Sequence, residues 1–105
     1  MDDGVKSGIR HGRVEVKDVV YVSWRAESAF ILNLSEGGLA VQAMDVLRPG
    51  ESLAFAFALP ADGAELAGVV RVVWSDRSGR AGLQFVDLPE FDRFQLRKWL
   101  SRYQN

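Results

Sequence analysis

Polar and small residues gather between residues 33 and 38 of this chain, in the stretch "NLSEGG". The Asn33 amide can both donate and accept hydrogen bonds, and the Ser35 hydroxyl can do either. Gly37 and Gly38 can take positive φ and leave backbone N–H groups unshielded, and consecutive N–H groups in a turn can form a concave anion site. The stretch therefore predicts a turn that can also hold an anionic ligand.

Two arginines precede this stretch in a short polar segment. Residues 1–13 contain Arg10 and Arg13, and we expect this segment to be a flexible basic N-terminal arm. A planar guanidinium matches phosphate oxygens and the O6 and N7 edge of guanine. The arm and the polar turn together predict a clamp for a nucleotide with phosphates. A solvated arm and a plain hairpin turn are the alternatives that the residues alone leave open.

Residue combinations that support catalysis are sparse. His11 is the only histidine, and the chain has no cysteine. Ser35 lacks the sequence context of a nucleophile elbow, and no carboxylate cluster has metal-ligand spacing. We therefore expect a binding protein rather than an enzyme, without a metal or a cofactor.

Length and charge restrict the class of protein further. A chain of 105 residues predicts one domain with its own core. The net charge of -1 gives no general attraction to nucleic acid or anionic membranes, so we expect neither as a partner. Single-stranded nucleic-acid binding remains a weaker alternative, because it needs a basic groove with aromatic residues. No signal peptide or bilayer-spanning apolar run is present, which predicts a cytoplasmic protein without membrane insertion.

Six segments alternate apolar and polar residues, which predicts half-buried strands. A helical spacing replaces this alternation over residues 88–103. Six strands that each bury one face are satisfied by a small barrel, because closure removes exposed edges. The fold expected for residues 14–105 is thus mainly β, a six-stranded antiparallel barrel with a C-terminal α-helix. The strands are expected at residues 14–24, 29–34, 38–43, 53–59, 65–75 and 81–86.

The same patterns predict details inside these elements. Phe30, Leu32 and Leu34 are expected on one face of their strand, and Trp74 is expected to face inward or to lie at the barrel rim. "RPGE" at residues 48–51 suits a type II turn. The helix is expected to cover apolar barrel surface with aromatic residues such as Phe91 and Trp99, or to pair two chains in a homodimer.

The chain resembles the PilZ domains, bacterial receptors for the second messenger cyclic di-GMP. That family combines an RxxxR arm, a first strand and the motif [D/N]xSxxG after the second strand. Asn33, Ser35 and Gly38 match the second motif one by one. "VVWSDRSGRAGLQFVDL" at residues 72–88 is similar to the family's final hairpin, and a helix follows it. The resemblance extends from about residue 9 to the C-terminus.

The arm departs from the family pattern, because Ile9 stands where the first Arg is expected and Arg10 with Arg13 gives RxxR. The resemblance implies that cyclic di-GMP is the ligand. It also implies a receptor that changes conformation on binding and regulates a partner protein in motility, biofilm formation or exopolysaccharide control. The alternative is a degenerate PilZ-like module that binds a protein and no cyclic di-GMP. The binding residues implied by the resemblance are Arg10, Arg13, Asn33, Ser35 and Gly38.

Overall fold

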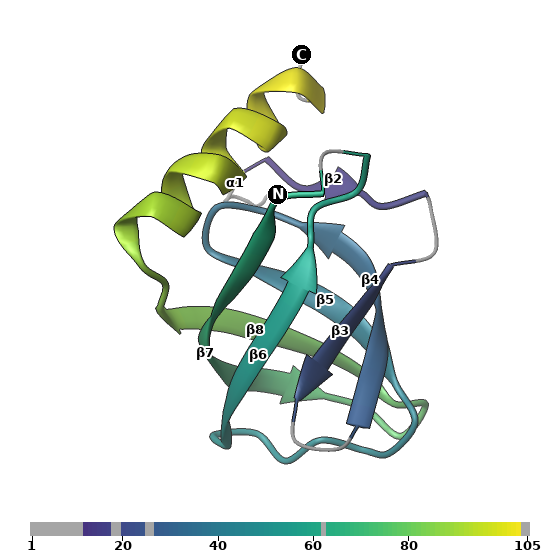
Figure 1. Cartoon of the computed structure of the whole chain (residues 1–105). Helices are drawn as coiled ribbons and strands as arrows, with labels where there is room; N and C mark the ends of the chain where they lie inside the picture. The colour runs from purple at the N-terminus through teal and green to yellow at the C-terminus, as the bar shows by residue number, and fades with distance from the viewer. Residues whose placement is uncertain (1–11, 18–19, 25–26, 62, 104–105) are drawn as a thin grey trace.

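A computed structural model describes residues 12–17, 20–24, 27–61 and 63–103 of the chain, which form strands and one helix (Figure 1). The helix α1 spans Glu90–Tyr103 and follows the last strand. Within the described residues, no helix is long and apolar enough to cross a membrane. The strands are β2 (Val14–Glu15), β3 (Tyr21–Trp24), β4 (Glu27–Leu34), β5 (Gly38–Ala43), β6 (Ser52–Ala58), β7 (Glu65–Ser75) and β8 (Arg80–Asp87).

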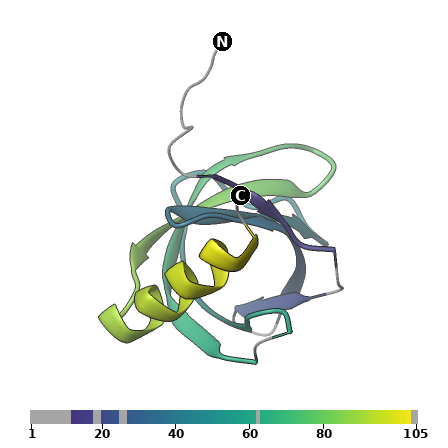
Figure 2. The same ribbon diagram turned by 90° about the horizontal axis from the view of Figure 1, so that it is seen from above.

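Six of the strands close into an antiparallel barrel. Their order is β4, β3, β6, β7, β8 and β5, and β5 pairs back with β4. Figure 2 shows the resulting ring of strands, with α1 lying across its opening. The short β2 pairs with the end of β4, where Val14 lies opposite Leu34. The predicted six-stranded barrel with a C-terminal helix is confirmed.

The core fills the barrel and continues under the helix. Leu53, Phe55 and Phe57 of β6 are buried, whereas the alanines between them are exposed, as the alternation predicts. The helix contributes three buried residues, Leu96, Trp99 and Leu100, to this same core. Polar contacts also fix the helix: the Trp99 indole donates to the Pro60 carbonyl at 2.8 Å, and the Asp92 carboxylate accepts from the Ala67 N–H at 3.0 Å.

The turn before β6 has the predicted conformation. The Glu51 N–H donates to the Arg48 carbonyl at 3.0 Å, and Gly50 has a φ of 92°. A type II turn needs this left-handed geometry at its third residue, where glycine carries no steric penalty.

The prediction of one continuous strand over residues 14–24 is wrong, because this segment is divided into β2 and β3. The Val16 N–H donates to the Leu32 carbonyl at 3.0 Å, whereas the Val20 carbonyl accepts from the Ile31 N–H at 2.9 Å. Ile31 and Leu32 are adjacent in β4, yet their partners are Val20 and Val16, which are four residues apart. A continuous antiparallel ladder does not allow this pairing. Residues 18–19 lie outside the described part.

The expected inner face of β4 is also corrected. Its pairing with β5 shifts register between Ile31 and Asn33, so the alternate residues that face the core differ before and after this point. Ala29, Ile31 and Leu34 are consequently buried, whereas Phe30 is exposed and contacts Tyr21 with 4.8 Å between the ring centroids.

Trp74 and Phe91 are also exposed rather than part of the core. The pairing of β7 with β8 shifts register between Val72 and Trp74, so Trp74 is 46% exposed and does not face inward. Phe91 is 67% exposed and does not cover apolar barrel surface. The helix itself begins at Glu90, two residues after the expected start at 88, with the Pro89 carbonyl accepting from the Arg93 N–H.

Candidate ligand site

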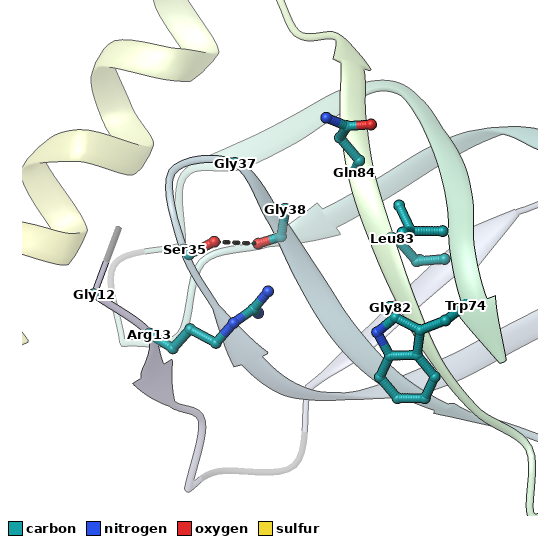
Figure 3. A pocket seen from close by; sticks show the side chains of 10 residues that line it. Gly12, Arg13, Ser35, Gly37, Gly38, Trp74, Gly82, Leu83 and Gln84 are labelled. Atoms are coloured by element: carbon teal, nitrogen blue, oxygen red, sulfur yellow. Dashed lines mark hydrogen bonds between the residues drawn. The ribbon is translucent and has the colours of Figure 1, made fainter. Parts of the chain in front are cut away.

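The motif turn joins β4 to β5 and is held by hydrogen bonds between its two ends. The Ser35 N–H donates to the Gly38 carbonyl at 2.9 Å, and the Gly38 N–H donates to the Ser35 carbonyl at 3.4 Å. The Ser35 hydroxyl donates to the Gly38 carbonyl at 3.3 Å (Figure 3). Because Ser35 is only 3% exposed, its hydroxyl supports the turn from inside.

Position 38 requires a glycine because strands β5 and β8 approach each other closely there. It lies opposite Gln84, and a Cβ at Gly38 would overlap the Leu83 carbonyl. Among the described glycines, a positive φ occurs at Gly50, Gly63 and Gly79. The motif glycine therefore provides space for β8 rather than a left-handed conformation, which corrects the role expected from its flexibility.

Arg13 reaches the turn from the residue before β2. The pairing of Glu15 with Asn33 brings this end of the chain beside the motif. The Arg13 Nη1 donates to the Asn33 Oδ1 at 2.6 Å. The structure thus brings Arg13, Asn33, Ser35 and Gly38 together, while Arg10 lies outside the described residues.

A hollow of about 710 Å³ opens beside the turn (Figure 3). This volume falls in the range of small-molecule sites, which is about 300–1,000 Å³. Asn33 does not line the hollow, but its Oδ1 accepts from Arg13, which does. The hollow is lined by Gly12, Arg13, Ser35, Gly37 and Gly38 from the motif side, and by Val73, Trp74, Gly82, Leu83 and Gln84 from β7 and β8.

Trp74, Gly82 and Gln84 are lining residues that the sequence motifs did not predict. Trp74 lies opposite Gly82 in the β7–β8 ladder, and a Cβ at Gly82 would overlap the indole. The missing side chain therefore lets the Trp74 ring lie over β8. A glycine inside a strand is a known sign of a bulge or a close approach, and Gly82 carried that signal in the sequence.

An ion pair connects the motif turn to α1. The Arg97 Nε donates to the Glu36 Oε2 at 2.5 Å. The hydrogen bond to Glu36 is the main cause that raises the pKa of Arg97 above its already high ordinary value. Glu36 is one of the two residues between Ser35 and Gly38, so the helix is joined directly to the turn that borders the hollow.

Comparisons with known proteins agree with this arrangement. A family model described as the PilZ domain matches residues 10–102. A solved structure of the Bacillus subtilis inhibitor of motility MotI/DgrA aligns with a TM-score of 0.69 at 24% sequence identity. The alignment covers 89% of this chain and 50% of that one, so the present chain spans about half its length. At this identity the likeness shows the fold.

No curated protein matches the chain. The family assignment rests on the match over residues 10–102, which takes in β2 to β8, most of α1 and every residue that lines the hollow. PilZ domains are binding domains rather than catalytic ones. The chain therefore belongs to the PilZ domain family.

Proposed function

We propose that this domain binds cyclic di-GMP in the hollow between the motif turn and Trp74. The observation that carries the proposal is that Arg13, the Ser35–Gly38 turn and the exposed Trp74 ring all border one hollow of about 710 Å³ (Figure 3). Membership of the PilZ family supports this choice of ligand among phosphate-bearing nucleotides.

Arg13 is suited to the phosphates of the ligand. Its guanidinium already donates to the neutral Asn33 amide at 2.6 Å, which holds the side chain beside the hollow. A phosphate competes well for the guanidinium, because it can accept two parallel hydrogen bonds and carries a negative charge, whereas the Asn33 amide is neutral. Once Arg13 has moved to a phosphate, the side-chain carbonyl of Asn33 can accept from the N–H groups of a guanine.

The opposite wall is suited to a base. Trp74 presents an exposed indole, and aromatic side chains stack on nucleobases with about 1–3 kcal/mol per base. Gln84 lines the same wall with an amide that can both donate to and accept from a base edge. These two residues extend the proposed site beyond the motif.

Arg10 remains part of the proposed site, although it lies outside the described residues. A hydrogen bond to a charged group contributes about 1.5–3 kcal/mol, which corresponds to roughly one to two decades of affinity. Since the arm has RxxR instead of RxxxR, the contribution of Arg10 determines whether binding is tight or weak.

We further propose that ligand binding regulates a partner protein in the cytoplasm. Drawing Arg13 away from Asn33 would change the surface around the turn, which α1 contacts through the Glu36–Arg97 pair. The similar solved structure is an inhibitor of motility, which favours a partner in motility over other processes such as biofilm formation.

One observation favours the second candidate, a PilZ-like module that binds a protein without the nucleotide. The described motif residues all have structural partners within the domain itself: Ser35 bonds to Gly38, Gly38 makes room for Leu83, and Arg13 bonds to Asn33. These contacts stabilise the barrel whether or not a ligand binds.

Calorimetric titration of the whole chain with cyclic di-GMP, with GTP as a control ligand, separates the two candidates. We expect saturable binding of cyclic di-GMP alone, weakened at least about tenfold by Arg13→Ala and by Trp74→Ala. Arg48→Ala is the matched control, because it removes an exposed arginine that does not line the hollow. Absence of binding at high micromolar ligand would contradict the receptor and leave the protein-binding module.

Fluorescence provides an independent readout of the proposed stacking. Trp24 and Trp99 are buried, whereas Trp74 is exposed, so a base on Trp74 should quench the emission of this residue. We expect Trp74→Phe to remove the quenching while binding remains measurable by calorimetry. Quenching that persists in Trp74→Phe would place the ligand elsewhere.

A further inference from the structure

The outward side of α1 carries an acidic, an aromatic and a basic residue in a single row. Glu90, Phe94 and Lys98 are spaced four residues apart, which places them on one side of the helix. All three are exposed, and Phe94 is 53% exposed. The buried residues Leu96 and Trp99 lie on the side that faces the barrel, so this row points away from it.

The row is complementary to itself. Glu90 precedes Phe94 by four residues and Lys98 follows it by four, so the backbone of each charged residue lies about 6 Å from that of Phe94 along the helix axis. A second copy of α1, related by a twofold axis near Phe94, would run antiparallel to the first. Glu90 of each copy would then lie against Lys98 of the other. Such an interface uses the same patch on both copies, as twofold dimers do.

We infer that α1 pairs antiparallel with α1 of a second copy of this chain, with Phe94 at the centre. Phe91, which is 67% exposed, adds apolar surface beside Phe94. The Lys98 Nζ lies 5.3 Å from the centroid of the Phe94 ring, which holds its charge over the apolar patch. This pairing does not depend on the binding of cyclic di-GMP.

The pairing is weak and depends on protein concentration. One helix face with two phenylalanines is much smaller than a standard interface, which buries about 1,600 Å² in total. Arg97 lies beside the row but is already bonded to Glu36, so the charge complementarity falls on Lys98. A stable dimer at low concentration is therefore not expected.

Sedimentation equilibrium of the whole chain, from about 10 µM to about 1 mM, tests the inference. We expect the average mass to rise toward that of a dimer with concentration. Phe94→Ala should raise the dissociation constant at least about tenfold, as loss of a central aromatic residue does. Met44→Ala is the matched control, since Met44 is 92% exposed and lies outside α1.

Charge reversal identifies the orientation. Glu90→Lys and Lys98→Glu each place like charges together in the antiparallel pair, so each should raise the dissociation constant by about fivefold. An equimolar mixture of these two variants restores opposite charges at both contacts, and we expect it to associate about as well as the parent chain.

Three results would overturn the inference. One is a chain that stays monomeric at the highest concentration. Another is a dimer that Phe94→Ala leaves unchanged. The third is a mixture of the two charge-reversal variants that associates no better than either alone. All substituted side chains are exposed, and a circular dichroism spectrum of each variant checks that it folds.

Discussion

Adjacent glycines of the motif turn have different surroundings. A Cβ at Gly38 would overlap the Leu83 carbonyl, whereas a Cβ at Gly37 would meet nothing within 4 Å. We expect Gly38→Ala to lower the free energy of unfolding by about 1–3 kcal/mol, because the backbone of β8 must shift. Gly37→Ala should stay within about 0.5 kcal/mol of the parent. Urea unfolding measures both, and equal effects would contradict the packing role of Gly38.

The contribution of the Asp76 carboxylate to stability depends on pH. Its carboxylate accepts from the Ser78 hydroxyl at 2.6 Å, from the Ser78 N–H at 2.9 Å and from the Arg80 N–H at 3.2 Å. The Ser78 hydroxyl is the main cause that lowers the pKa of Asp76 below its ordinary value of 3.8. The carboxylate therefore stabilises the β7–β8 turn above the unfolded-state pKa, and this stabilisation is lost as pH falls through the folded-state pKa.

Urea unfolding of the parent and of Asp76→Asn between pH 7 and pH 2 tests this assignment. We expect the parent to be more stable at pH 7 and the difference to shrink as pH falls below about 4. A difference that stays constant over this range would mean that the charge of Asp76 does not contribute.

At the scale of elements, α1 and the motif turn are joined by the exposed Glu36–Arg97 pair. We expect a double-mutant cycle with Glu36→Gln and Arg97→Gln to show a favourable coupling at low salt that disappears in 1 M NaCl, because exposed charges are screened. Thermal unfolding at both salt concentrations measures the coupling. Coupling of equal size in high salt would point to packing instead of charge.

At the scale of the whole molecule, barrel and helix share one core. Leu96 of α1 is fully buried in the cluster that also contains Trp24 of β3. We expect Leu96→Ala to cost about 2–5 kcal/mol and to lower the stability of barrel and helix together. Near-ultraviolet and far-ultraviolet circular dichroism should then give one common transition. A helix that melts before the barrel would show that the two elements are not one cooperative unit.

Much of this architecture follows from local pattern. In β6, large apolar side chains alternate with alanines, and the pleat of a strand puts them on opposite faces in any sheet. The barrel and its terminal helix were predictable for this reason, as was the type II turn at Gly50. The motif residues Asn33, Ser35 and Gly38 were also found in the sequence, because they match a family pattern at one turn.

Only the tertiary structure decided which side chains form the opposite wall of the hollow. The register shifts in β4 and β7 turn Phe30 and Trp74 outward, and they arise from pairing with strands that are distant in sequence. The contact of Arg13 with Asn33 and the space between Gly38 and Leu83 likewise exist only after β2, β4, β5 and β8 pair. Alternation is a property of one strand, whereas register and close approach are properties of two, so the sequence determined the barrel and its motif turn but not the opposite wall of the site.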